Sequence, residues 1–191
     1  FNSQTQFLIN KDLGFNHKNI IYLPMKENLG DKYDLVKTKL KQHPSIQSVS
    51  AIDNLEIYGA ERCKGCFRWK SNPDPQGNTF DAILSQVDFD YFKTMEIPLQ
   101  LGRSFSEEFA SDSIGGFVLN NAALEKMHID NPLDEFCQLG EYEGPIIGVV
   151  KDVYVCGSKT EITPQIYSII KDPANVVPNG VILVKYNPAD R

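Results

Sequence analysis

The sequence predicts an α+β fold built on a split β-α-β unit, into which a smaller subdomain is inserted. A strand, a helix and a second strand follow one another within residues 19–52, and another strand and a short helix occupy residues 80–95. A last strand of the same type appears only at residues 181–186, after a long stretch with its own pattern. A ferredoxin-like β-α-β-β-α-β order is completed by this delayed strand, so the intervening residues are expected to form a guest subdomain.

The composition is that of a globular protein. The 191 residues are 41% hydrophobic, enough for a buried core, and the formal charge is −6. A nucleic-acid-binding surface needs clustered Lys and Arg, so this charge argues against one. No run of 18 apolar residues occurs, and no membrane-spanning helix is expected. The sequence opens without Met or a signal peptide, and we expect it to be a segment of a longer protein.

The first unit begins with a helix and a strand. Residues 1–15 predict a helix that ends near Gly14, a residue suited to the position that follows a helix. The apolar run at residues 20–23 predicts a short buried strand. Residues 46–52 predict a second strand of the same unit.

The helix between these two strands is predicted from its ends and its apolar spacing. Asp31 is suited to cap its start, with Asp34 three residues later, and His43-Pro44 ends it. The predicted inner face consists of Tyr33, Val36 and Leu40, and the predicted solvated face of Lys37, Lys39 and Lys41.

The next part of the chain alternates a connection, a strand and a short helix. Residues 53–79 are rich in Gly, Pro, Asn and Asp, which predicts a long connection with a short strand at residues 67–69. Residues 80–87 predict a strand. Asp88 is suited to cap the helix that follows, Pro98 prevents its continuation, and Gly102 tolerates positive φ. The apolar face of this helix is predicted to consist of Phe89, Phe92 and Met95.

Residues 104–165 interrupt the first unit. Their predicted elements are a turn at 106–108, a strand at 116–120, a helix at 121–127 and a hairpin of strands at 136–139 and 145–150. A strand at 166–170 then leads to the delayed strand at 181–186. We therefore predict one subdomain of residues 1–103 with 166–191, and an inserted α+β subdomain, mainly β, of residues 104–165.

Several short motifs occur in order along nearly the whole chain. They are Lys11-Asp12-Leu13-Gly14-Phe15, His43-Pro44-Ser45-Ile46-Gln47-Ser48-Val49-Ser50, Val87-Asp88-Phe89-Asp90-Tyr91-Phe92, Leu101-Gly102-Arg103-Ser104-Phe105, Leu119-Asn120-Asn121-Ala122-Ala123, Pro132-Leu133 and Ile146-Ile147-Gly148-Val149-Val150-Lys151-Asp152. As an ordered set they resemble the extracytoplasmic domain of FtsX-like ABC-transporter permeases, the MacB-like periplasmic core domain. The motif residues that this resemblance marks as structural are Asp88, Tyr91, Phe92, Gly102, Arg103 and Gly148.

The resemblance implies a non-catalytic periplasmic module of a membrane protein. It implies a porter-like subdomain with an inserted smaller one, placed between the first two transmembrane helices of a permease on the outer face of the bacterial inner membrane. The implied partners are the rest of the permease, its cytoplasmic ATPase, a second permease in a dimer, and a periplasmic adaptor or substrate. No phosphate-binding Gly-x-x-x-x-Gly-Lys-Ser/Thr loop occurs, so ATP binding would belong to another region or polypeptide, and no cofactor is implied.

The cysteines allow three interpretations. Cys63 and Cys66 form a Cys-x-x-Cys motif, which in a redox enzyme stands at a helix N-terminus, whereas the neighbouring residues here predict a strand. A four-thiolate zinc site with Cys137 and Cys156 is a second interpretation, although the wide spacing of that second pair is unusual. A structural disulfide between Cys63 and Cys66, or unreacted thiols, is the interpretation we favour.

Other candidate groups have structural explanations in the sequence. Asp88 and Asp90 could act as an acid-base pair, but a helix cap and a solvated acid in the first turn explain them without a perturbed pKa, and we favour this interpretation. Arg103 could bind an anion, or fix the corner after Gly102 by pairing locally. Trp69 with Phe67 could form an exposed contact patch or cover the core. The three histidines, His17, His43 and His128, lack a metal-binding spacing, and no Gly-x-Ser-x-Gly motif occurs.

Two functional hypotheses follow. The first is a domain of an ABC-transporter permease that couples ATPase-driven motion to export or to an extracytoplasmic partner. The second is a free-standing periplasmic ligand-binding or chaperone-like module. A thiol or zinc protein is a third, weaker alternative.

Overall fold

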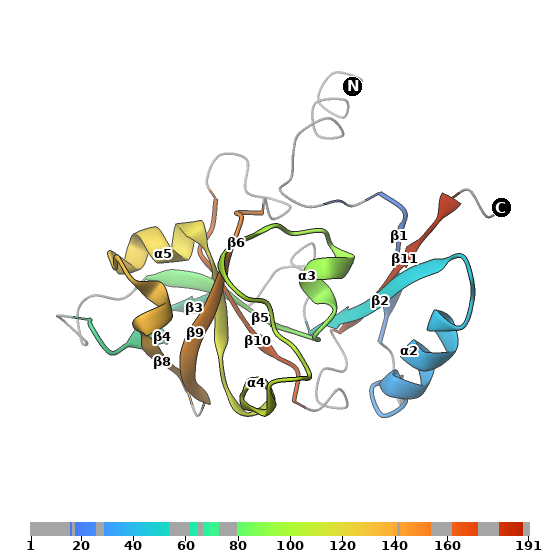
Figure 1. The fold of residues 1–191 in the computed structure, drawn as a ribbon, viewed down its shortest axis with the longest axis horizontal. Helices are drawn as coiled ribbons and strands as arrows, with labels where there is room; N and C mark the ends of the chain where they lie inside the picture. Colours follow the sequence, from blue (N-terminus) through green and yellow to red (C-terminus); the bar gives the residue numbers. More distant parts are fainter. Residues whose placement is uncertain are drawn as a thin grey trace, which may run out of the picture.

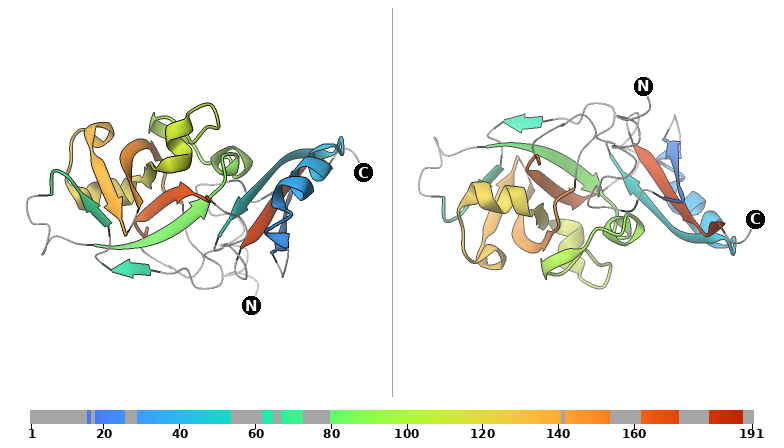
Figure 2. Two further views of the ribbon diagram at one scale, coloured as in Figure 1. Left: turned by 90° about the horizontal axis from the view of Figure 1, so that it is seen from below. Right: turned by 90° about the horizontal axis from the view of Figure 1, so that it is seen from above.

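The strand-helix-strand unit predicted at the start of the chain is present. It consists of β1 (Ile20–Pro24), α2 (Tyr33–Lys41) and β2 (Ile46–Ile52). The delayed strand β11 (Val181–Tyr186) lies between β1 and β2 and is antiparallel to both. We call these four elements the small lobe, in which α2 lies against one face of the three-stranded sheet (Figures 1 and 2).

The computed structural model describes residues 16, 18–25, 29–53, 62–64, 67–72, 80–140, 142–153, 162–171 and 180–188. The helix predicted for residues 1–15 lies outside these ranges. In the described part, no helix is long and apolar enough to span a membrane.

Strand β5 (Asp81–Val87) connects the small lobe to the rest of the sheet. It is antiparallel to β2, with Val87 opposite Ile52, and parallel to β10 (Gln165–Ile169). The delayed strand therefore belongs to the same sheet as residues 20–23 and 82–87, as predicted. The α+β fold with a split β-α-β unit is confirmed.

The remaining strands form what we call the large lobe, together with β5 and β10. Along the sheet the order is β1-β11-β2-β5-β10-β7-β9-β8-β4, with β3 paired to β5 and β6 paired to β9. The added elements are β3 (Arg62–Lys64), β4 (Phe67–Trp69), β6 (Leu99–Gly102), α4 (Ala110–Ile114), β7 (Phe117–Asn120), α5 (Asn121–Met127), η3 (Pro132–Asp134), β8 (Phe136–Leu139) and β9 (Tyr142–Val150). Strand β10 is paired to both β5 and β7. The boundaries of the two predicted subdomains stay a prediction.

Helix α3 (Tyr91–Thr94) lies between the two lobes and contacts β2 and β11 of the small lobe (Figure 1). Its buried Tyr91 and Phe92 belong to a core cluster that includes Ile52 of β2, Tyr167 of β10 and Leu183 of β11. One apolar cluster thus spans the junction, while separate clusters fill the interiors of the small and large lobes.

The start of α5 shows how a local motif fixes an element. The Asn120 side chain accepts a hydrogen bond from the N–H of Ala123 at 3.0 Å, which caps the helix. The same oxygen accepts from the N–H of Gln165 at 2.8 Å and so attaches β10 to this corner. The helix ends at His128, whose φ of 53° is left-handed. The predicted helix at 121–127 is confirmed.

The predictions for the burial of β1 and for the cap of α2 are wrong. The strand expected to be buried is an exposed sheet edge, with Ile21, Tyr22 and Leu23 all exposed, because β1 has β11 on one side and no second strand among the described residues. Asp31 does not cap α2. The first helical N–H, that of Tyr33, donates instead to the carbonyl of Gly30 at 3.0 Å, so a preceding turn replaces the side-chain cap.

Two glycines of the motif set lie where β6 pairs with β9. Gly102, with φ +70°, is opposite Gly148. A Cβ on Gly102 would lie 2.3 Å from the carbonyl oxygen of Ile147, and one on Gly148 would lie 2.3 Å from that of Arg103. Neither position accepts a side chain without displacing backbone, which explains glycine at both.

We expect Gly102→Ala to destabilise the protein more than Gly140→Ala. Both residues have positive φ, at +70° and +59°, but no atom lies within 4 Å of a Cβ built on Gly140. Gly140→Ala should cost about 1 kcal/mol through backbone strain alone. Gly102→Ala should cost a further 1–3 kcal/mol, roughly, through overpacking. Urea unfolding followed by Trp69 fluorescence measures both costs, and equal costs would contradict the crowding.

Candidate functional site

The junction between the lobes is organised around the carboxylate of Asp88, which is 7% exposed. One oxygen accepts hydrogen bonds from the Tyr33 hydroxyl and from Lys37 Nζ, the latter at 2.7 Å. The other accepts from Ser50 Oγ at 2.5 Å and from the N–H of Asp90 at 3.1 Å. This one side chain therefore connects α2 and β2 to the start of α3.

Two lysines of α2 extend this network. Lys37 Nζ lies 2.8 Å from an Asp90 oxygen as well as 2.7 Å from Asp88, and only 14% of its side chain is exposed. Lys41 Nζ lies 2.8 Å from the same Asp90 oxygen. The negative charges of two carboxylates are thus balanced by the positive charges of two ammonium groups. Both lysines belong to the same helix.

The network changes the acidity of its members. Burial alone would lower the pKa of Lys37, but the charge of Asp88 and hydrogen bonds to both carboxylates outweigh it and raise that pKa. Burial alone would raise the pKa of Asp90, whereas hydrogen bonds from Lys37 and Lys41 hold it below its usual value. Burial, and then the adjacent Asp88 charge, raise the pKa of the Tyr33 hydroxyl far above its usual range. The charged forms of Lys37 and Asp90 and the neutral form of Tyr33 are therefore favoured.

The role of Asp88 corrects the sequence interpretation. Its carboxylate accepts from the N–H of Asp90, but α3 itself begins at Tyr91, with Asp90 in the N-cap position and no side-chain cap. Lys37, expected on a solvated face, is largely buried against these carboxylates. Asp88 and Asp90 are paired with lysines, which is a structural arrangement and not that of an acid-base pair. The available signal was the spacing of Tyr33, Lys37 and Lys41, which places three donors on one face of a helix.

The other end of α3 is attached to the small lobe by Glu96, whose φ of 52° is left-handed. Its carboxylate accepts a hydrogen bond from the buried Lys185 of β11. The second oxygen accepts from Asn16 Nδ2 at 2.7 Å. The hydrogen bonds from Lys185 and then Asn16 lower the pKa of Glu96. Both ends of α3 are thus bound to the small lobe through charged groups.

The large-lobe side of α3 is aromatic. Phe92 packs edge-on against Tyr167 of β10, with ring centroids 5.0 Å apart, and stacks on Phe105 at 6.1 Å. Tyr91 lies 5.4 Å from Phe92 and 5.9 Å from Tyr167. The two motif aromatics therefore fasten the helix to the large lobe through apolar contacts.

Arg103 pairs locally, as one of the two interpretations predicted. Its guanidinium makes two hydrogen bonds to the buried carboxylate of Asp112, at 2.6 and 2.8 Å. The ring of Phe109 lies 4.0 Å from the guanidinium carbon. Asp112 also accepts from the N–H of Ser106 at 3.0 Å, so the pair fixes the loop that leads from β6 to α4.

The described residues test only part of the three cysteine interpretations. The backbone of Cys63 is in β3, but its side chain, Cys66 and Cys156 lie outside the described residues. Cys137 is a buried free thiol whose pKa is raised, chiefly by burial. In the described part of the chain, no group of three His, Cys, Asp or Glu side chains could hold a metal. The Cys63–Cys66 pair stays a prediction.

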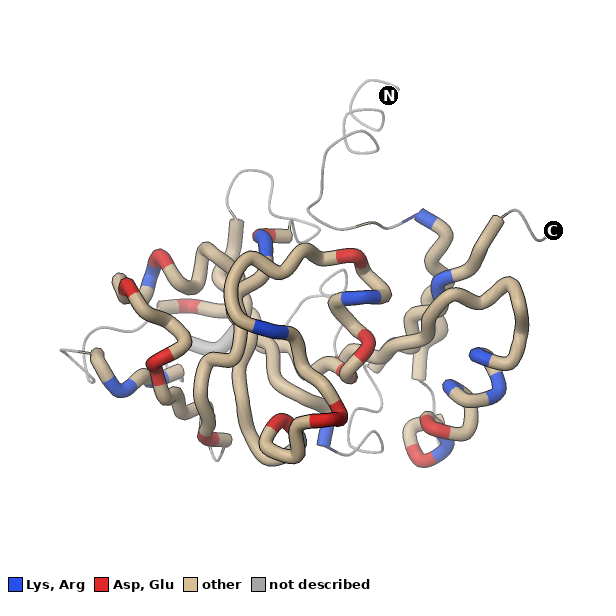
Figure 3. Tube along the Cα trace, viewed as in Figure 1, with Lys and Arg blue, Asp and Glu red and all other residues tan. Residues whose placement is uncertain are grey.

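The aromatic and histidine candidates have structural positions. Trp69 and Phe67 are buried, with Phe67 packed edge-on against Phe117 at 5.4 Å, so they cover the core and the exposed patch is excluded. Of the histidines within the described ranges, His43 follows α2 and His128 ends α5, in different lobes. Charged residues of both signs are interspersed over the described chain (Figure 3).

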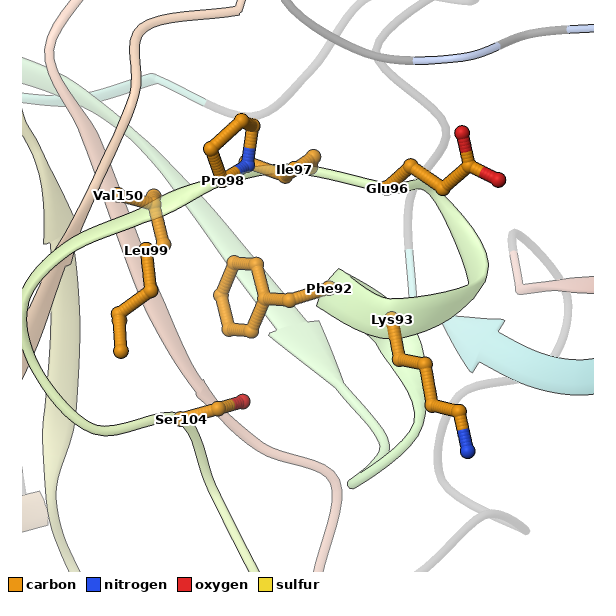
Figure 4. A pocket seen from close by; sticks show the side chains of 8 residues that line it. All are labelled: Phe92, Lys93, Glu96, Ile97, Pro98, Leu99, Ser104 and Val150. Atoms are coloured by element: carbon orange, nitrogen blue, oxygen red, sulfur yellow. The ribbon is translucent and has the colours of Figure 1, made fainter.

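An apolar groove of about 390 Å³ lies between α3 and β6 (Figure 4). We call it the α3–β6 groove. Its apolar lining consists of Phe92, Ile97, Pro98, Leu99 and Val150, and its polar lining of Lys93, Glu96 and Ser104. Sequence reasoning missed the groove, because it depends on how β6 folds back beside the helix.

Comparison with known proteins identifies the fold. No family model matches the sequence, and a search of curated proteins finds no match. Among solved structures, the periplasmic region of MacB from Actinobacillus actinomycetemcomitans is similar over 95% of this chain and 80% of its own, with 20% identity and a TM-score of 0.61. The extracellular domain of the ABC-type transporter YknZ from Gram-positive bacteria is similar over 90% and 83%, with 17% identity and a TM-score of 0.55.

A domain of a protein assigned as a permease from Porphyromonas gingivalis is similar over 80% of this chain and 67% of its own, with 13% identity and a TM-score of 0.56. At these identities the similarity establishes the fold. The chain therefore has the fold of periplasmic and extracellular domains of transporter proteins, which agrees with the sequence resemblance.

We expect Asp88→Ala to lower the free energy of unfolding by about 3 kcal/mol, because it leaves the buried Tyr33 hydroxyl without its acceptor and Lys37 with Asp90 alone. Asp34→Ala, on the exposed side of the same helix, should change it by no more than about 0.5 kcal/mol. Adding Tyr33→Phe to Asp88→Ala should recover about 1 kcal/mol, because the buried hydroxyl that has lost its acceptor is removed. Chemical unfolding measures all three, and equal effects of the two single variants would contradict the network.

The raised pKa of Tyr33 predicts a loss of stability at high pH. In the unfolded chain a tyrosine loses its proton near pH 10, roughly, whereas folded Tyr33 keeps its proton. Above that pH the folded state binds one more proton, so this residue lowers the free energy of unfolding by about 1.4 kcal/mol per pH unit. Urea unfolding from pH 9 to 11.5 should show a shallower decline for Tyr33→Phe than for the unsubstituted chain. Identical slopes would exclude the effect.

Proposed function

We propose that this chain is the extracytoplasmic domain of an FtsX-like ABC-transporter permease, and that it relays ATPase-driven motion to a substrate or an extracytoplasmic partner. The single observation that carries the proposal is the fold similarity to the periplasmic region of MacB over 95% of this chain. The ordered sequence motifs support it independently, since they extend over nearly the whole chain.

The geometry of the junction supports a relay of motion. The lobes meet around α3, which is held to one lobe by ion pairs at both ends and to the other by stacked aromatic rings. Such a joint makes the two lobes move together, so a displacement applied to one is passed to the other. The buried charged groups around α3 are engaged with one another, which favours a mechanical role over catalysis.

The proposal includes partners and a location. The domain would project from the outer face of the bacterial inner membrane and be continuous with the transmembrane helices of its permease. A cytoplasmic ATPase, a second copy of the permease and a periplasmic adaptor or substrate would complete the assembly. Residues 1–103 with 166–191 would form the porter-like subdomain and residues 104–165 the inserted one.

A second candidate is a free-standing periplasmic ligand-binding or chaperone-like module. The observation that favours it is the α3–β6 groove, whose volume of about 390 Å³ suits a small apolar ligand. The groove is also compatible with the first proposal, because a relay domain needs a surface for its partner. The two candidates differ in what the gene encodes beyond this chain.

For the permease domain, we expect the gene to encode an apolar helix directly before Phe1 and further apolar helices after Arg191, with an ATPase gene nearby. Sequencing outward from both ends checks this. A signal peptide ending at Phe1 together with a stop codon after Arg191 would favour the free-standing module instead.

In the assembled transporter, spin labels at Ile114→Cys, which is 72% exposed on α4, should change their distance between two copies when ATP replaces ADP. The control is the pair Leu35→Cys and Ile114→Cys within one copy, whose distance should stay constant because the junction joins the lobes rigidly. Pulsed electron resonance measures both distances. An inter-copy distance that is the same with ATP and with ADP would contradict the relay of motion.

A further inference from the structure

The α3–β6 groove is part of a longer apolar surface. Leu99, which lines the groove, and Leu101 are each 43% exposed, and the whole of β6 is exposed. Leu133 of η3, 40% exposed, has a methyl carbon 2.8 Å from a Cβ built on Gly102 and so lies beside the end of β6. The apolar surface therefore runs from the groove along β6 to η3.

Strand β6 also lies at an edge of the sheet. Among the described strands it pairs with β9 alone. An exposed strand with one unoccupied edge is a template for a second extended chain, whose backbone supplies the missing hydrogen bonds. Adjacent pockets then select the side chains of that second chain.

The charges at the groove favour an acidic ligand. The carboxylate of Glu96 points away from the groove and is occupied by Lys185 and Asn16 (Figure 4). The Lys93 side chain also extends away from Phe92 and Leu99, from the rim of the groove (Figure 4), but it is exposed, and within the described ranges no ion pair involves it. Lys93 is thus a positive charge at the rim that has no negative partner, and a carboxylate of the ligand would complement it.

We propose that the α3–β6 groove and β6 together bind an extended segment of another polypeptide. One apolar side chain of that segment enters the groove beside Phe92 and Leu99, its backbone follows β6, and a carboxylate pairs with Lys93. A second copy of this chain is the poorer fit, because β6 is Leu-Gln-Leu-Gly and pairing two such strands brings no β6 carboxylate to Lys93. The proposal rests on the proposed function, which it deepens by naming the surface and the chemistry through which the domain binds its extracytoplasmic partner, and a failed crosslink would leave the permease assignment itself intact.

Photo-crosslinking in the native cell tests the proposal on the full-length parent protein. A p-benzoylphenylalanine replaces Gln100, which is exposed in the middle of β6. We expect a crosslink to a different polypeptide, within a segment that alternates apolar and acidic residues, located by mass spectrometry. The same photoreactive residue at Leu35, exposed on α2, is the control and should not capture that segment.

Two substitutions of Lys93 test the charge. Lys93→Glu should reduce the crosslink yield about fivefold, since it replaces an attraction with a repulsion. Lys93→Arg should keep the yield within about twofold, because the charge is retained. Lys93 is exposed, so neither change should alter the melting temperature. A crosslink only to a second copy, only to lipid or to nothing would overturn the proposal, as would a yield insensitive to Lys93→Glu.

Discussion

The structure depends on the cost of burying one carboxylate. Asp88 is largely removed from water, and an ionised group in that position is stable only when hydrogen-bond donors replace the water it has lost. Those donors come from α2, from β2 and from the backbone before α3, so satisfying Asp88 requires all three elements to take one relative position. A buried ion pair of this kind adds little net stability but penalises every arrangement that breaks it. Its main effect is therefore to select one geometry of the junction.

Helix α3 takes part in both the core and the groove. Phe92 belongs to the buried aromatic cluster and also lines the α3–β6 groove, so the floor of the groove is continuous with the core that joins the lobes. Lys93, the next residue, is on the rim of the groove. A ligand in the groove would contact the helix that connects the lobes, which links partner binding and the relay of motion through one element.

The sequence was sufficient wherever a pattern is local. The strands at 46–52 and 67–69 and the helix at 121–127 have the predicted bounds, because alternation and helical spacing are both read within a few residues. The role of Asp88 could not be read this way, since Ser50 and Tyr33 lie 38 and 55 residues before it in the chain. The exposure of β1 was missed for the same reason, because edge position is decided by β11. The groove likewise requires α3 and β6 to be placed first.

The position of β11 also bears on how the chain folds as it is made. β1 and β2 are not neighbours, and the strand that joins them, Val181–Tyr186, is synthesised long after both of them. Until then the small lobe has a helix and two separate strands but no sheet, and the apolar residues of β1 have no partner. Contacts so distant in sequence form slowly, because a long loop must close first. Within this domain, the lobe that begins first is therefore completed last. Until then its unpaired strands are prone to aggregate and depend on chaperones for protection.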